Sequence, residues 1–150
     1  MTLQTALSNQ MVIDCADVCR EASEARESDS VALVGCLALP SDQTFADLQQ
    51  QADDFRAVAD RLDDWHDRAE SDQEVGSTEE RRHLLDDLRL VLIAIRVAAF
   101  DVGLHGRGAN MTDTEIADEL GKYARLDCQL RAHLLPALKD ELGVTDTVAI

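Results

Sequence analysis

Apolar residues recur at steps of three and four along most of this chain, a spacing that places their side chains on one face of an α-helix. Four stretches of this kind predict long helices over residues 2–26, 41–70, 78–102 and 112–142. Only 3% of the residues are aromatic, so we expect a core of Leu, Val, Ile and Ala. Such a core suits helices packed on helices better than it suits a sheet.

Polar residues at two of the predicted helix starts form capping boxes, in which Ser or Thr is followed three residues later by Glu. Ser77 and Glu80 mark the start of the third long helix, and Thr112 and Glu115 mark the start of the fourth. Glycines in the segment 103–108 end the third helix. Because the connections before and after the third helix are short, we expect its sequence neighbours to pack against it in antiparallel fashion.

Two prolines modify this arrangement. The apolar run 31–39 ends at Pro40 and follows the polar residues 28–30, which predicts a short separate helix with its own cap. Pro136 lies inside the last helix and predicts a kink or break near 132–136. The predicted fold is therefore an all-α, up-and-down antiparallel bundle of four long helices plus one short helix, in a single domain over residues 1–150.

The predicted helix 78–102 is apolar on two sides. One stripe has the spacing of an ordinary core face and consists of Leu88, Val91, Ile95, Ala98 and Val102. A second stripe lies about 140° further round the helix and consists of Leu90, Ile93, Val97 and Phe100. A helix that is apolar nearly all round is covered on both sides. The second stripe is therefore covered either by the short or last helix of the same chain or by a second copy in a homodimer.

Arginines recur at heptad spacing on this same helix, at Arg82, Arg89 and Arg96. They lie away from the core stripe, so we expect a solvated polar face there. In the last helix, Asp127 and Arg131 fall within the apolar stripe, four residues apart, and are interpreted either as a buried or interfacial ion pair or as residues that the kink turns into solvent.

The chain is strongly acidic, with 30 Asp and Glu against 14 Lys and Arg and a net charge of -16. Only Lys122 and Lys139 are lysines. This composition predicts a halophile's protein, because carboxylates retain water and cations in concentrated salt. In about 1 M salt the Debye length is roughly 3 Å, so the acidity excludes few partners.

The sequence offers no Gly-rich loop and no basic patch with interleaved aromatics, so nucleic-acid binding is not supported. It also begins with no basic and apolar leader, and its longest apolar stretch, 91–100, is far shorter than the roughly 20 residues of a membrane span. We therefore expect a cytoplasmic protein that does not enter a membrane.

The cysteines supply an alternative function. Cys15 and Cys19 are four residues apart on the first helix, in line with Met11, and together with Cys36 they predict a thiolate site for Cu or Zn, or a redox centre. The competing interpretation treats them as core residues, because free Cys behaves as a small hydrophobe. No C-x-x-C pair of the usual zinc type is present.

A third alternative is a di-iron carboxylate bundle. Glu80 and His83 have the Glu-x-x-His spacing of such sites, and Asp63 and His66 repeat the spacing with Asp in place of Glu. The sequence does not indicate any catalytic residue, because catalytic triads are recognised by their three-dimensional geometry. The leading hypothesis is a non-enzymatic protein without a cofactor that acts through protein contacts, with Leu90, Ile93, Val97 and Phe100 as its homodimer interface.

Overall fold

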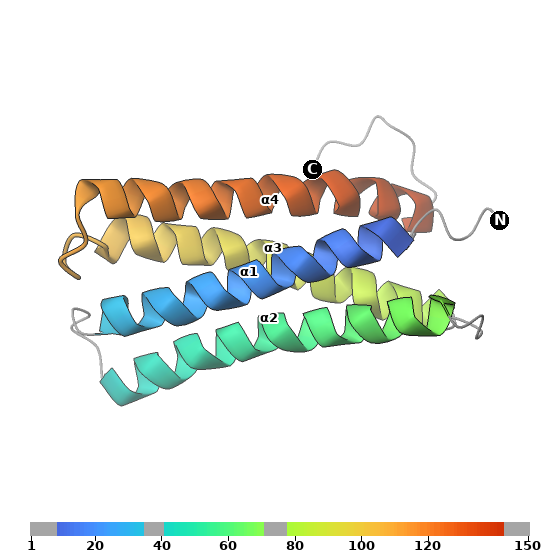
Figure 1. The fold of residues 1–150 in the computed structure, drawn as a ribbon, viewed down its shortest axis with the longest axis horizontal. Helices are drawn as coiled ribbons and strands as arrows, with labels where there is room; N and C mark the ends of the chain where they lie inside the picture. The colour runs from blue at the N-terminus through green and yellow to red at the C-terminus, as the bar shows by residue number, and fades with distance from the viewer. Residues whose placement is uncertain (1–8, 35–40, 71–77, 143–150) are drawn as a thin grey trace.

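The computed structural model describes residues 9–34, 41–70 and 78–142, which form four α-helices and no strand (Figure 1). Their bounds are α1, Asn9–Val34; α2, Ser41–Glu70; α3, Thr78–His105; and α4, Asp113–Leu142. Successive helices run in opposite directions, so the up-and-down antiparallel bundle predicted from the sequence is confirmed (Figure 1).

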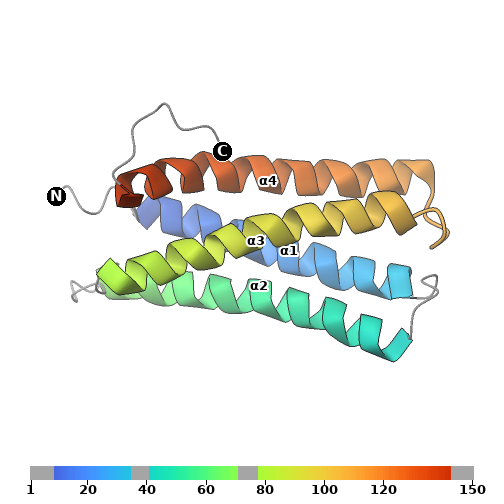
Figure 2. The same ribbon diagram turned by 180° about the vertical axis from the view of Figure 1, so that it is seen from behind.

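The bundle consists of two helical hairpins. α1 packs most extensively against α2, and α3 packs against α4, whereas α2 and α3 share few contacts. Figure 2 shows the reason, because α3 crosses the bundle obliquely, close to α2 at its start and close to α4 at its end. The C-terminal half of α3 is therefore separated from the N-terminal half of α2.

The core is built mainly from aliphatic side chains of all four helices, as the composition predicts, and it also contains Phe55, Trp65 and Tyr123. The core stripe of α3 is fully buried, at Leu88, Val91, Ile95, Ala98 and Val102. Burying one such large aliphatic side chain contributes roughly 1.5–3 kcal/mol relative to leaving it in water. Helices α1 and α2 contribute to the same buried cluster, through Met11, Cys15, Val18 and Ala22 of α1 and Phe55, Val58, Leu62 and Trp65 of α2.

Two predicted interruptions are absent, the start of a separate helix at 31 and a break near Pro136, whereas the alternative of a kink near Pro136 stays a prediction. Residues 28–30 lie inside α1 and cap nothing, because α1 continues to Val34, so the short helix does not begin at 31. The remainder of that predicted helix, 35–39, and Pro40 lie outside the described residues. Helix α4 continues through Pro136 to Leu142 without a break.

The capping box at the start of α4 is confirmed. The backbone N–H of Thr112 donates to Glu115 Oε1 at 2.9 Å, and the N–H of Glu115 donates to Thr112 Oγ1 at 3.1 Å. The hydrogen bond from the Thr112 backbone N–H favours the carboxylate form and lowers the pKa of Glu115, and the Thr112 side chain acts in the same direction. The start of α4 is therefore fixed by the two residues that the sequence pattern indicates.

The turn between α3 and α4 depends on Gly106. Its N–H donates to the carbonyl of Val102 at 2.8 Å, and its carbonyl accepts from the N–H of Met111 at 3.0 Å. A Cβ at this position would lie 2.6 Å from the Val102 carbonyl oxygen and 2.8 Å from Ile116 Cγ1. Both distances are too short for a carbon contact, so this turn requires glycine.

Gly106→Ala and Gly121→Ala are expected to change stability in opposite directions. The first forces the turn open, and we expect a loss of about 1–3 kcal/mol. The second places a Cβ on α4 where no atom lies within 4 Å, so it is expected to stabilise the helix by about 0.5–1 kcal/mol. Urea denaturation of both variants measures the difference, and equal effects would contradict the role assigned to Gly106.

Candidate interaction surface

The second apolar stripe of α3 is exposed. Its side chains are between 44% and 66% accessible and belong to Leu90, Ile93, Val97, Phe100 and Leu104. These five residues form the α3 stripe. No helix in the described part of the chain covers them, so the last helix, α4, does not provide the cover. Residues 35–39 of the predicted short helix lie outside the described residues, so cover by that segment stays a prediction.

Leu104 was not predicted as part of the stripe. The predicted helix ended at 102, whereas α3 continues to His105 and carries Leu104 onto the same face as Phe100. The signal was present in the sequence, because the steps between the five residues alternate regularly between three and four. This is the spacing of a and d positions in a heptad, which forms a narrow seam for another helix.

The two edges of the α3 stripe contact different neighbouring helices, one edge α4 and the other edge α2 and α1. On one edge, Arg96 Nε donates to Asp127 Oδ2 of α4 at 3.1 Å. On the other edge, Asp87 accepts from Arg61 of α2 and Asp101 accepts from Arg26 of α1. The predicted ion pair is present at the first edge, where Arg131 Nε donates to Asp127 Oδ1 at 2.7 Å, and both side chains are partly exposed.

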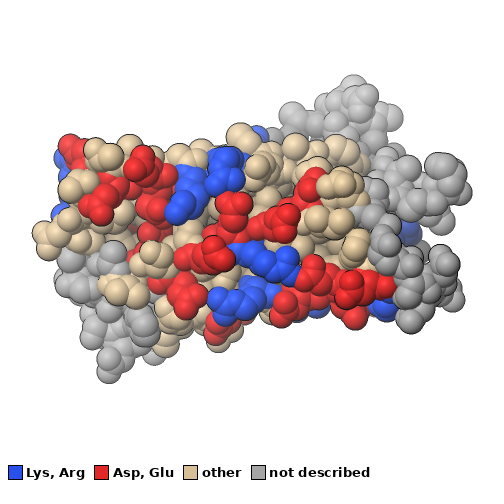
Figure 3. Space-filling model, viewed as in Figure 1, with Lys and Arg blue, Asp and Glu red and all other residues tan. Residues whose placement is uncertain are grey.

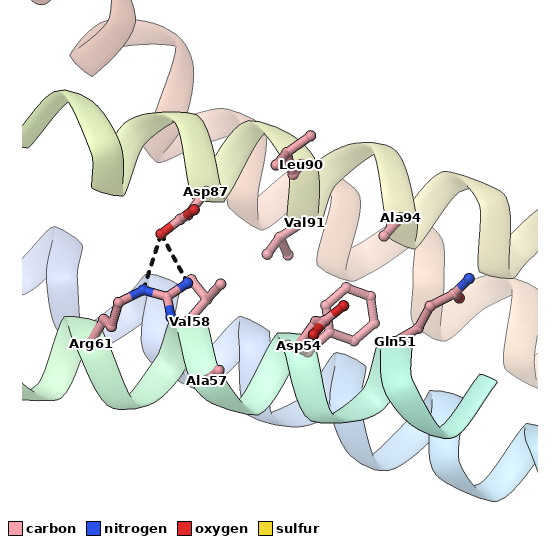
Figure 4. Close-up of a pocket in the computed structure, with 10 residues that line it drawn as sticks. Gln51, Asp54, Ala57, Val58, Arg61, Asp87, Leu90, Val91 and Ala94 are labelled. Atoms are coloured by element: carbon pink, nitrogen blue, oxygen red, sulfur yellow. Dashed lines mark hydrogen bonds and ion pairs between the residues drawn. The ribbon is translucent and has the colours of Figure 1, made fainter. Parts of the chain in front are cut away.

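A groove of about 290 Å³ lies beside the stripe, between α2 and α3 (Figure 4). It exists because the two helices diverge there. Its apolar lining consists of Phe55, Ala57, Val58, Leu90, Val91 and Ala94. One end is closed by Arg61, whose Nη2 lies 2.9 Å from Asp87 Oδ2 (Figure 4). Since Leu90 belongs to both features, the groove extends the exposed apolar surface.

The face of the bundle seen in Figure 3 carries many charged side chains. Acidic and basic side chains are interleaved there along the helices. Exposed ion pairs also join α1 to its neighbours, through Arg56 of α2 with Glu27 at 3.1 Å and Arg125 of α4 with Glu21 at 2.8 Å. Such exposed pairs contribute at most about 1 kcal/mol each, so this face is a solvated surface.

Arg26 of α1 lies inside the bundle, and only 1% of its surface is exposed although its guanidinium group is charged. Its Nη2 donates to Asp101 Oδ2 at 2.7 Å and its Nε donates to Gln51 Oε1 at 2.8 Å. These bonds join α1 to α2 and α3 at the point where the hairpins diverge. Arg26 therefore supports the helix that carries the stripe.

A second buried polar contact lies one turn further along α1. The hydroxyl of Tyr123 on α4 donates to Asp29 Oδ2 at 2.6 Å, and Asp29 is only 3% exposed. Burial raises the pKa of Asp29 to about 6, the Tyr123 hydrogen bond opposes this rise, and Glu119 adds to it. Burial likewise raises the pKa of Tyr123. This contact fixes α1 against α4.

Of the three cysteines in the described helices, Cys15 and Cys19 lie together in the core on α1, and Cys128 lies on α4. Cys15 and Cys19 are fully buried, and burial raises the pKa of Cys15 to about 12 and also raises the pKa of Cys19. Because the thiolate is the form that binds metals, these thiols have the properties of core residues. Cys128 is exposed on α4, and Cys36 lies outside the described residues. The Cu or Zn site that includes Cys36 stays a prediction.

Both carboxylates of the di-iron alternative are bound by arginines. Glu80 accepts a hydrogen bond from Arg68, and Asp63 accepts one from Arg20. His83 is exposed beside Glu79. Within residues 9–34, 41–70 and 78–142, no group of three or more His, Cys, Asp or Glu side chains is arranged to hold a metal ion.

None of the four described helices combines the length and apolar character needed to cross a membrane. Comparisons of the chain with protein-family models, curated proteins and solved structures find no match. The exposed apolar surface of α3 is therefore the feature that bears on function.

Proposed function

We propose that this protein is a non-enzymatic helical bundle that acts through protein contacts, as a homodimer formed along the α3 stripe. The observation that carries the proposal is the exposure of five large apolar side chains in one continuous row on α3. Monomeric soluble proteins rarely expose contiguous apolar surface of this extent unless it binds something.

The occupant favoured by this surface is a second copy of the chain. A row at heptad spacing accepts a helix with the same spacing, and α3 itself is such a helix. Two-fold dimers are also the commonest oligomers, because one patch then serves both partners. The groove beside Leu90 enlarges the apolar area that association removes from water.

The proposed dimer depends on the salt concentration around the protein. With a net charge of -16 per chain, two copies repel each other in dilute buffer. At the salt concentrations of a halophile's cytoplasm this repulsion is screened, whereas the apolar contact is not weakened. We therefore propose that the dimer forms in concentrated salt and weakens as salt is removed.

Ile93→Asp is expected to convert the dimer into a monomer. The substitution places a carboxylate at the centre of the apolar contact, where it loses its hydration without gaining a partner. Since Ile93 is exposed in the single chain, the helical content is expected to remain unchanged. Light scattering in about 2 M KCl measures the mass, and circular dichroism checks the fold.

The matched control is Val31→Asp, which introduces the same charge at an exposed apolar residue of α1. This variant is expected to retain the mass of the dimer. A single-chain mass for the unmodified protein in concentrated salt would overturn the proposal. Equal dissociation of both variants would show that charge, and not the position on α3, controls association.

A further inference from the structure

The two edges of the α3 stripe carry opposite charges. Arg82, Arg89 and Arg96 are seven residues apart and follow one edge, on the side where Arg96 contacts α4. Asp87 and Asp101 follow the other edge, on the side that contacts α2 and α1. All three arginines are exposed, and each of the two carboxylates keeps nearly a third of its surface accessible.

Two copies can bring their stripes together with the two-fold axis either along α3 or across it. With the axis along the helix, the arginine edge of each copy faces the aspartate edge of the other. With the axis across the helix, arginine faces arginine and aspartate faces aspartate. Like charges placed together oppose association, so the edges distinguish the two arrangements.

We infer that the two copies associate in parallel along α3, with Arg82 and Arg96 of each copy facing Asp87 and Asp101 of the other. This inference rests on the homodimer proposed above. Each arginine precedes its aspartate by five residues, which is the offset at which the flanking positions of parallel heptads meet. The apolar stripe supplies the affinity, and the charged edges select the direction.

The parallel arrangement places each residue of the stripe opposite its own counterpart. In the antiparallel arrangement centred on Val97, Leu90 instead lies opposite Leu104 of the second copy. The two copies of Leu90 are then about 21 Å apart, because each lies seven residues from the centre. A disulfide needs Cα atoms within about 7 Å, so cross-linking distinguishes the two directions.

The experiment uses Leu90→Cys and Leu104→Cys, each in the full chain with Cys36→Ser and Cys128→Ser. The remaining thiols, Cys15 and Cys19, are buried. Under mild oxidation in concentrated KCl, each variant alone is expected to form covalent dimers. When the two variants are mixed, one of them carrying a tag that changes its size, covalent dimers that contain one chain of each are expected to remain a minor product.

Cross-linking that appears only in the mixture would overturn the parallel direction and leave the homodimer intact. A dimer mass by light scattering with no cross-linking in any sample would place the interface elsewhere and overturn both proposals. A single-chain mass would overturn the homodimer itself. The failure of the direction is thereby distinguished from the failure of the proposed function.

A substitution at the edge gives an independent measurement. Arg82→Glu places a negative charge opposite Asp87 of the second copy, so we expect about a tenfold weaker dimer. The measurement belongs at the lowest KCl concentration at which the unmodified protein is still a dimer, where screening is least. Unchanged or tighter association would contradict the parallel direction.

Discussion

Arg26→Met is expected to lower the free energy of unfolding by about 3 kcal/mol, because breaking a buried ion pair leaves its second charge without compensation. Methionine preserves most of the buried stem and removes the donors to Asp101 and Gln51. Asp101 keeps 28% of its side-chain surface exposed, so the loss falls at the lower end for buried pairs. Urea denaturation at one fixed protein concentration measures it, since association changes apparent stability.

The control for this variant is Arg56→Met. Arg56 also joins α1 to α2, through Glu27 at 3.1 Å, but about half of each side chain is exposed. Its loss is therefore expected to cost less than about 1 kcal/mol. Adding Asp101→Leu to Arg26→Met is expected to restore part of the stability, because the isolated carboxylate is then absent. Equal losses for Arg26 and Arg56 would contradict the buried role of Arg26.

The unmodified protein is expected to lose stability relative to Asp29→Asn as the pH rises from about 4 to about 7. Burial raises the pKa of Asp29 to about 6, so near pH 5 the folded protein holds a proton that the unfolded chain releases. The stability that protonated Asp29 contributes is fully present below the ordinary pKa of Asp. It is lost as the pH rises through the raised pKa of Asp29 in the folded protein. The shift corresponds to about 2–3 kcal/mol.

The comparison isolates Asp29 because both proteins contain all the other carboxylates. Asparagine keeps an oxygen that accepts the Tyr123 hydroxyl, so the contact between α1 and α4 survives. In Tyr123→Phe the bond that favours the charged form is absent, and the loss of stability is expected to shift to higher pH. Denaturation curves measured across this pH range at constant salt test both statements, and parallel curves for the unmodified protein and Asp29→Asn would contradict the raised pKa.

Local patterns in the sequence predicted the helices well because each pattern reports on a local cause. The capping box at Thr112 and Glu115 forms from residues within one turn. The second stripe of α3 was recognised because spacing alone places four of its residues on one side of a helix. Leu104 was omitted because a nearby glycine, Gly103, was interpreted as the end of the helix, whereas α3 continues to His105.

The prediction of a separate helix at 31–39 is wrong because contacts between residues far apart in the sequence decide the structure there. Ser28, Asp29 and Ser30 have the composition of a helix cap, yet α1 continues through them. Asp29 is accommodated inside the bundle by Tyr123, which lies 94 residues away, and Arg26 by Asp101, which lies 75 residues away. No local pattern carries information about partners so distant in sequence.

By itself the sequence determined the all-α class, the up-and-down order of four long helices and the apolar row on α3. These features follow from helical periodicity and from the cost of leaving apolar side chains in water. Only the tertiary structure decided that this row is left uncovered by the described helices and which charged residues flank it. The physical reason is the oblique course of α3, which separates it from α2 and turns its second face outward.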